Sequence, residues 1–104
     1  MAQFDVYENE DADSNRNIPF LLDVQHSLHN DLVTRVVVPL LSVSLGGGEA
    51  RKLCPRFNIM GRDVIMGTPE MAGYPARNLR NKVASLAEQR AEILAAVDFL
   101  LNGF

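Results

Sequence analysis

The side chains that most often act as nucleophiles or metal ligands are scarce in this chain. Cys54 is the only cysteine, and His26 and His29 are the only histidines. Histidines three residues apart can share one face of a helix, but no cysteine or carboxylate stands at a spacing that would complete a zinc site. No catalytic motif surrounds Cys54, and a free cysteine often packs as a small apolar side chain. The sequence therefore predicts no catalytic centre, no metal site and no cofactor, and we expect a binding protein rather than an enzyme.

The glycine-rich segment Gly46-Gly47-Gly48-Glu49-Ala50-Arg51-Lys52 is the nearest approach to a phosphate-binding loop. It lacks the spacing that would place a lysine and a hydroxyl on a phosphate and its magnesium ion. Because glycine adopts positive φ angles at no steric cost, we expect a turn here instead.

Four carboxylates fall within one polar, asparagine-rich segment; they are Glu8, Glu10, Asp11 and Asp13. Asparagine and aspartate favour turns, so residues 8–17 are predicted to form an exposed loop. The residue pattern of a calcium-binding loop is absent. Two interpretations stay open, namely that the carboxylates are simply solvated or that they bind a basic peptide.

Composition places the chain among folded single domains. It has 104 residues, of which 47% are hydrophobic and 22% charged, so residues 1–104 are expected to form one domain with one modest core. A net charge of −3 argues against direct binding to nucleic acid. Neither a signal peptide nor a membrane-spanning run is apparent, so we expect a cytoplasmic protein without a membrane partner.

The first two-thirds of the chain predicts short strands joined by turns, because apolar residues alternate with polar ones or form β-branched runs. The predicted strands are residues 3–7, 19–25, 34–40, 41–45, 56–60 and 62–66, the last two joined by a turn at Gly61-Arg62-Asp63. Pro39 cannot donate a ladder hydrogen bond, so it is expected to end its strand or mark a bulge. Such close spacing leaves no room for crossover helices, which predicts an antiparallel, strongly bent sheet in a small barrel or two packed sheets.

The last third of the chain changes to a helical period. Apolar residues recur at alternating steps of four and three, interrupted by Arg90; they are Leu79, Val83, Leu86, Ile93, Val97 and Leu100. The helix can begin at a cap on Asn78, or at a capping box made by Ser85 and Glu88. It is expected to end at Asn102-Gly103, because glycine tolerates the left-handed conformation of a helix cap.

The end of this helix is apolar on nearly every side. Between Ile93 and Leu101 only Asp98 is polar, and one sheet can cover only one side of a helix. A second copy of the chain is therefore predicted to cover Phe99, Leu100 and Leu101. The two C-terminal ends would then lie near one axis and attract a cation such as a partner's arginine. Phe104 either completes this dimer contact or docks a partner.

Several phrases occur in an order that resembles the CcdB toxins of toxin–antitoxin modules. They are QFDVY, FLLDVQ, RVVVPLLSVS, KLCPRFNIMGRDVIMGTPEMAGYP and the closing Asn-Gly-Phe. These phrases extend over nearly the whole chain. The resemblance implies a mainly β fold, a small SH3-like antiparallel barrel with an extra small sheet and a C-terminal α-helix, assembled as a homodimer.

The same resemblance implies a function without catalysis. CcdB-type toxins bind the A subunit of DNA gyrase, trap the cleaved-DNA complex, and are neutralised by a cognate antitoxin, an arrangement known from plasmid maintenance. By position, the gyrase contacts would be Asn102, Gly103 and Phe104, with Asp98 from the helix and Leu28 from the loop after the DVQ strand.

Two departures from the family pattern concern these contacts. The family typically has tryptophan where Asn102 stands and an aliphatic residue where Phe104 stands, and asparagine offers no surface for a cation–π contact with a gyrase arginine. The loop that is basic in well-known members is acidic here. Glu8, Glu10, Asp11 and Asp13 therefore predict an antitoxin tail that is more basic than usual.

Two other functions compete with gyrase poisoning. A CcdB-like dimer that binds its antitoxin but has lost gyrase poisoning is suggested by Asn102. A ribonuclease toxin is less favoured, because no acid–base pair is evident and the net charge is acidic.

Overall fold

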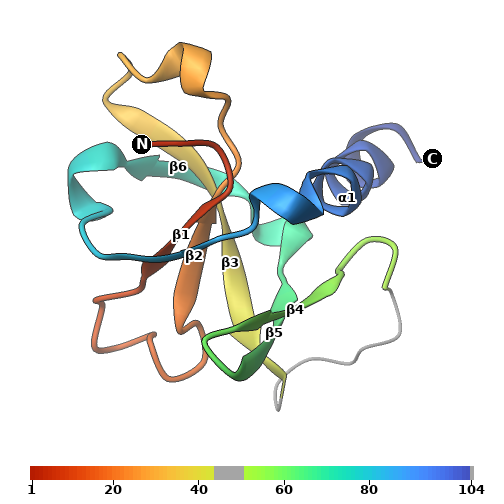
Figure 1. Cartoon of the computed structure of the whole chain (residues 1–104), viewed down its shortest axis with the longest axis horizontal. Coiled ribbons are helices and arrows are strands. Elements are labelled where there is room, and N and C mark those ends of the chain that lie inside the picture. The colour runs from red at the N-terminus through yellow and green to blue at the C-terminus, as the bar shows by residue number, and fades with distance from the viewer. Residues whose placement is uncertain (44–50, 104) are drawn as a thin grey trace.

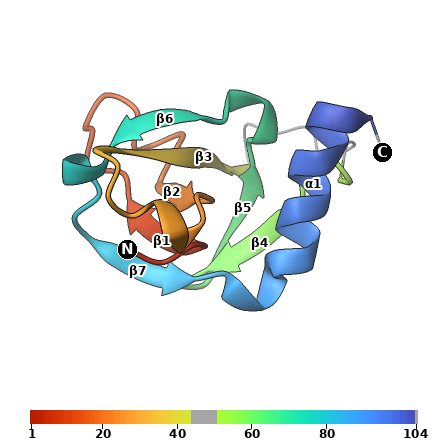
Figure 2. The same cartoon turned by 90° about the horizontal axis from the view of Figure 1, so that it is seen from above.

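The computed structural model describes residues 1–43 and 51–103, and within them seven antiparallel strands form one curled sheet beside a C-terminal helix (Figure 1). The strands are β1 Asp5–Glu8, β2 Phe20–Asp23, β3 Thr34–Ser42, β4 Arg56–Ile59, β5 Arg62–Met66, β6 Ala72–Pro75 and β7 Lys82–Ser85. Short 3₁₀ turns occur at η1 Ser27–His29, η3 Thr68–Glu70, η4 Ala76–Asn78 and η5 Ala87–Gln89. The helix α1 spans Arg90–Asn102 and lies at one end of the curled sheet, beside β4 and β5 (Figure 2).

Strand β3 is the centre of the sheet, because it pairs with three other strands. The strand order is β4-β5-β3-β2-β1-β7, and β6 pairs with β3 outside this path. Residues Thr34–Val37 of β3 pair with β6, and Leu40–Ser42 pair with β5, on the edge that faces away from β2. The small additional sheet expected from the resemblance is therefore a branch of the one main sheet.

The expectation that Pro39 ends its strand or marks a bulge is wrong, because β3 continues through it in regular register with β2. Pro39 lies inside β3, where it stands opposite Leu21 of β2. Its carbonyl accepts a hydrogen bond from the Gly67 N–H at 2.8 Å, and its nitrogen faces the same edge of the strand. Along that edge, β3 pairs with β6 up to Val37 and with β5 from Leu40. Pro39 lies between these two pairings, so no strand hydrogen bond is lost because proline has no N–H. Leu41 and Ser42, predicted as part of a separate strand, continue β3, whereas residues 44–50 with the predicted glycine turn lie outside the described residues.

Alternation along β1, β2 and β3 gives the sheet two buried faces. Val6, Leu22 and Val38 belong to the larger core, which also contains Ile93 and Ala96 of α1. A smaller cluster on the opposite face consists of Tyr7, Leu21, Val37 and Leu79. Because both faces are covered, these central strands carry few exposed side chains.

The predicted hairpin of β4 and β5 is present, but its turn lies one residue earlier than expected. Met60 and Gly61 both have positive φ angles, of 54° and 82°, which is typical of the two-residue type I′ turn. Asn58 supports the turn by accepting a hydrogen bond from the Gly61 N–H at 3.0 Å.

The long helix with a cap at Asn78 is wrong. Val83 lies in β7, which pairs with β1, and Leu79 belongs to the smaller core. The shorter alternative is closer, because Ser85 Oγ accepts from the Ala87 N–H at 3.2 Å just before η5, and α1 follows directly. Apolar residues spaced by four and three are typical of a helix, but the same spacing also occurs in an irregular chain whose apolar side chains reach different parts of the core. The predicted end is confirmed, since Gly103 has a φ of 79° and donates to the Phe99 carbonyl at 2.9 Å.

Candidate binding surfaces

The last turns of α1 form an exposed tip that is anchored from below. Ile93 and Ala96 are fully buried in the main core, whereas Leu101 is 68% exposed and Leu100 is also exposed. Asp98, Asn102 and Gly103 lie exposed on the same end of the helix. The structure thus brings together three of the residues predicted to contact gyrase, and Phe104 lies outside the described residues.

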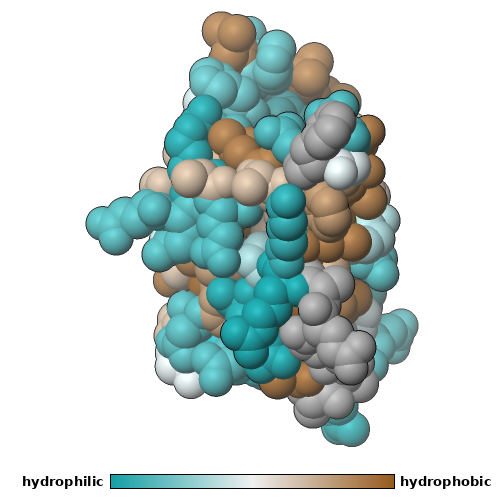
Figure 3. Space-filling view, turned by 90° about the vertical axis from the view of Figure 1, so that its right-hand side faces the viewer, coloured by the Kyte–Doolittle hydropathy of each residue, from teal (hydrophilic) through white to brown (hydrophobic). Residues whose placement is uncertain are grey.

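Phe99 differs from the other two residues predicted for a dimer interface. It is half-buried within the monomer, and Lys52 Nζ stands 4.8 Å from the centroid of its ring. This contact is a cation–π interaction. The face that carries the end of α1 is accordingly mixed, with hydrophobic surface interrupted by a hydrophilic band (Figure 3). Leu100 and Leu101 are therefore the freer apolar side chains of this tip.

A second exposed apolar surface is the loop between β2 and β3, which we call the η1 loop (residues 24–33). Leu28 is 79% exposed and Val33 is 83% exposed, and Leu32 is also open to solvent. Hydrophobic atoms project at the upper end of the molecule in Figure 3, the level at which η1 lies in Figure 1. Leu28 therefore lies on an exposed loop as predicted, but on a part of the chain separate from the tip of α1.

The η1 loop stands on a buried ion pair that the sequence reasoning missed. Arg35 and Asp23 are 1% and 0% exposed, and Arg35 Nη2 lies 2.8 Å from Asp23 Oδ2. Arg35 also donates from Nε to the same carboxylate oxygen at 2.9 Å. Burial raises the pKa of Asp23, although the Arg35 guanidinium and the Gln25 N–H oppose this effect. Asp23 lies on β2 and Arg35 on β3, and these two strands are paired. Predicting the ion pair from the sequence would have required knowing the register of that pairing.

The four carboxylates of the predicted antitoxin site do not form one free acidic patch. Glu10 pairs with Arg80 at 3.0 Å, and Glu8 accepts a hydrogen bond from the Asn81 side chain. Asp11 is used within its own turn, where its carboxylate accepts from the Asp13 N–H and the Ser14 hydroxyl, both at 3.1 Å. Asp13 is exposed. The predicted exposed loop is thus present, with part of its charge already neutralised.

Asn9 is the exception within this loop, because it is buried. Its side chain donates to the Ile18 carbonyl at 2.8 Å and to Ser14 Oγ at 3.0 Å, and it accepts from the Asp11 N–H at 3.1 Å. The loop is therefore tied to the start of β2 and presents Glu8, Glu10 and Asp13 outward.

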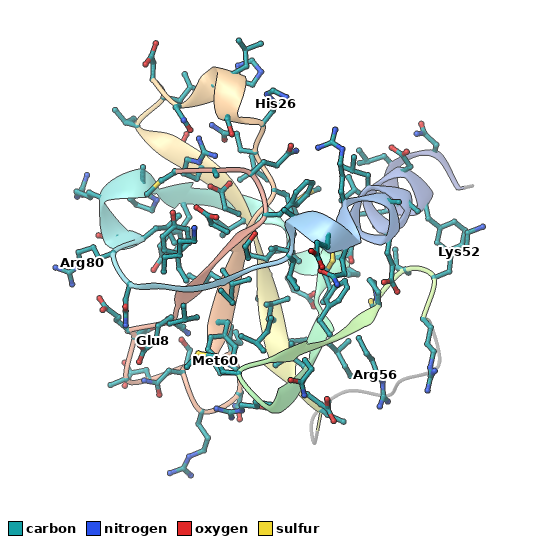
Figure 4. All side chains as sticks on the ribbon, in the orientation of Figure 1. Glu8, His26, Lys52, Arg56, Met60 and Arg80 are labelled. Carbon is teal, nitrogen blue, oxygen red and sulfur yellow. The ribbon has the colours of Figure 1, made fainter. Side chains whose placement is uncertain are left out.

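A pocket of about 470 Å³ opens beside this acidic loop. Its lining combines polar and apolar side chains: Glu8, Asn9, Asn15, Pro19, Phe20, Ile59, Met60, Arg62 and Val83. Figure 4 shows Glu8 and Met60 near each other, far from His26 at the other end of the molecule. Met60 is 73% exposed at the tip of the β4–β5 turn. The pocket and the acidic loop together form a third candidate binding surface, remote from the η1 loop.

The residues considered for catalysis or metal binding remain dispersed. Cys54 is half-buried, and burial raises the pKa of its thiol. Across residues 1–43 and 51–103, no group of three or more histidine, cysteine, aspartate or glutamate side chains could hold a metal ion. The same described residues contain no helix long and apolar enough to cross a membrane.

Comparison with known proteins identifies the family. The model of the CcdB protein family matches residues 3–103. No match was found among curated proteins. The match extends over nearly the whole chain and agrees with the curled β-sheet and C-terminal helix. The chain therefore belongs to the CcdB family, and this membership implies a toxin of a toxin–antitoxin module.

Proposed function

We propose that this protein is a homodimeric toxin that binds the A subunit of DNA gyrase and traps the cleaved-DNA complex. It acts by binding and catalyses no reaction itself. The observation that carries the proposal is the tip of α1, where Leu101 is exposed while Ile93 and Ala96 hold the helix firmly to the core. A rigid helix that ends in an exposed apolar tip is suited to docking rather than to chemistry.

A dimer formed through the tip would be consistent with this role, and we include it in the proposal. Burying one leucine side chain contributes about 1.5–3 kcal/mol, and a two-fold interface buries each residue twice. Leu100 and Leu101 are the side chains best placed for that contact, with Phe99 partly covered already by Lys52. Association would bring two copies of Asn102 and Gly103 close to one axis.

A gyrase cleavage assay with supercoiled DNA and ATP tests the proposal. We expect linear DNA to accumulate with this protein, and less of it with Leu101→Gln or Phe104→Ser. Met60→Gln is the matched control, because Met60 is similarly exposed but lies at the turn between β4 and β5, away from the C-terminal end of α1 (Figures 1 and 2). No linear DNA with the unaltered protein, while a fluoroquinolone still produces it, would overturn gyrase poisoning.

A cognate antitoxin would use the other surface. The pocket beside Glu8 and Met60 can receive an apolar side chain, and Glu8, Glu10 and Asp13 attract basic residues next to it. Glu10→Lys is expected to weaken antitoxin binding through charge repulsion, with gyrase binding unchanged. Unchanged antitoxin affinity in that variant, measured by calorimetry, would move the antitoxin site elsewhere.

Asn102 favours one alternative, a dimer that binds antitoxin but does not poison gyrase. Asparagine lacks the aromatic face that tryptophan offers to an arginine at this position. Asn102→Trp separates the two functions: a gain of gyrase cleavage from an inactive starting protein would support the alternative, whereas cleavage by the unaltered protein would exclude it.

A further inference from the structure

We infer that Asp23, Gln25 and Arg35 are positioning residues that hold Leu28 in the orientation in which it binds gyrase, an inference that rests on the proposed function. Leu28 itself is exposed and contributes to no core. What fixes its place must therefore be the backbone of the η1 loop.

Beyond Val24, which is partly buried against the main core at its start, the η1 loop has no apolar anchor. None of residues 26–34 is buried, and Leu28, Leu32 and Val33 all face solvent. Hydrogen bonds within the loop shape η1: the Leu28 N–H donates to His26 Nδ1 at 2.9 Å and the His29 N–H to the His26 carbonyl at 3.0 Å. Such local bonds give the loop a shape but do not attach it to the sheet.

Attachment comes chiefly from the buried pair through Gln25. The Gln25 N–H donates to Asp23 Oδ1 at 3.0 Å, and the Gln25 carbonyl accepts from Arg35 Nη2 at 2.9 Å. The Gln25 side chain then donates to the carbonyls of His29 at 3.0 Å and Thr34 at 3.3 Å. Its own oxygen accepts from the Val36 N–H at 3.0 Å.

Arg35 also reaches the loop directly. Its Nη1 donates to Asn30 Oδ1, immediately after η1. Four further bonds hold the loop near its ends. At Val24, the N–H donates to the Val36 carbonyl at 3.0 Å and the carbonyl accepts from Gln3 Nε2 at 3.1 Å. The Gln3 N–H donates to Ser27 Oγ at 3.2 Å, and the Ala76 N–H donates to the Val33 carbonyl at 2.9 Å. The stretch between them, which contains Leu28 and His29, depends on Gln25 and Arg35.

A buried ion pair is seldom the most stable way to fill its volume, because both charges lose their hydration. The guanidinium has a property that an apolar side chain lacks, since its donors point in fixed directions within one plane. Here those donors reach Asp23, Gln25 and Asn30 at once. The pair thus places the middle of a loop that is otherwise attached only near its ends.

The test replaces the pair without leaving a buried charge. In Asp23→Leu/Arg35→Met both partners become apolar residues of similar size, and the sheet is expected to fold normally. Gln25→Met is a second variant, which keeps the ion pair but removes the Gln25 side-chain bonds to the loop at His29 and to β3 at Thr34 and Val36. Amide hydrogen exchange of the full-length protein is the first readout. We expect exchange at His29 and Asn30 to become about tenfold faster, with the amides of β1 and β2 unchanged.

Gyrase binding is the second readout, with antitoxin binding as its control. Both variants are expected to lower gyrase affinity about tenfold and to leave antitoxin affinity unchanged, because the antitoxin surface is remote. A double-mutant cycle with Leu28→Ala then identifies the route. If the network acts through Leu28, then removing the network in a protein that already carries Leu28→Ala has little further effect on gyrase affinity.

Each outcome decides between the two roles. Unchanged exchange at His29 and Asn30, or additive effects with Leu28→Ala, would overturn the positioning role. Equal loss of gyrase and antitoxin affinity would mean that the pair only stabilises the fold. If the unaltered protein binds no gyrase, the proposed function is wrong, and so is the claim that the network positions Leu28 for gyrase. The exchange data still decide whether the network orders the loop.

Discussion

The tip of α1 and the η1 loop both present apolar side chains to solvent, but they are held in opposite ways. The tip is held by apolar packing, because Ile93 and Ala96 of the same helix are fully buried in the main core. The η1 loop has no buried residue between His26 and Thr34 and is held by a charged pair and an amide side chain.

The contrast shows how the local backbone decides the type of anchor. A helix can bury one side and expose the other along the same turns, so packing alone fixes what it displays. An irregular loop has unpaired backbone groups that need partners, and polar side chains provide both these partners and the attachment. The order of such a loop is therefore expected to decrease more when a charged side chain is removed than when a methyl group is removed.

The largest expected effect breaks the polar anchor on one side only. Arg35→Met leaves Asp23 buried without its partner, and the free energy of unfolding is expected to fall by about 3–5 kcal/mol. Asp23→Leu/Arg35→Met should recover most of this loss, because no charge is then left unpaired. Urea denaturation followed by circular dichroism measures both. Equal stability of the single and the double variant would show that the pair is not energetically coupled.

The apolar anchor is expected to respond next. Ile93 is fully buried, so Ile93→Ala should lower the free energy of unfolding by about 3 kcal/mol through lost burial and a residual cavity. Leu101→Ala on the same helix is the matched control and should change it by less than about 0.5 kcal/mol in the monomer. Similar losses for both variants would contradict the division of α1 into a buried anchor and an exposed tip.

A smaller effect concerns the assembly. Leu101→Gln keeps helix propensity but removes an apolar contact from each protomer, so the dissociation constant of the dimer is expected to rise at least about tenfold. Sedimentation velocity over a dilution series measures this change. Met60→Gln should leave the dimer intact, and a dimer that is insensitive to Leu101→Gln would place the interface on another face.

The smallest expected effect is local to the loop. His26 Nδ1 accepts from the Leu28 N–H, so His26→Ala removes one hydrogen bond worth about 1 kcal/mol. Amide exchange at Leu28 should become several-fold faster with the overall stability unchanged. His26→Asn retains an acceptor that is common at helix N-caps and should restore protection. A fall in overall stability would show that the loop is coupled to the sheet more strongly than the contrast with α1 implies.

Periodicity predicted much of this molecule. The alternating and β-branched runs predicted β1 to β5, and Asn102-Gly103 marked the end of α1, because these signals depend only on neighbouring residues. The branch at β6 and the interior position of Pro39 depend on which strands become partners, and a single sequence does not state that. Val83 illustrates the same limit, since its spacing fits a helix and its pairing with β1 makes it a strand.

The candidate surfaces were predicted unevenly for a related reason. Exposed residues such as Leu28, Asp98 and Asn102 were identified through the family resemblance. Leu32 and Val33 were missed because apolar residues are usually assigned to the interior. Arg35 was missed because an arginine within a strand is usually expected to face solvent.

The position of β3 has a consequence for how the protein loses its structure. This strand alone joins β2, β5 and β6, so no part of the sheet persists as an independent unit once β3 detaches. Unfolding is then expected to be a single all-or-none transition. A substitution that detaches β3 from its neighbours would abolish every binding surface together, whereas a change that leaves the pairing of β3 intact can remove one surface alone. In a genetic screen, variants that separate two partners should therefore be variants that keep the strand pairings of β3.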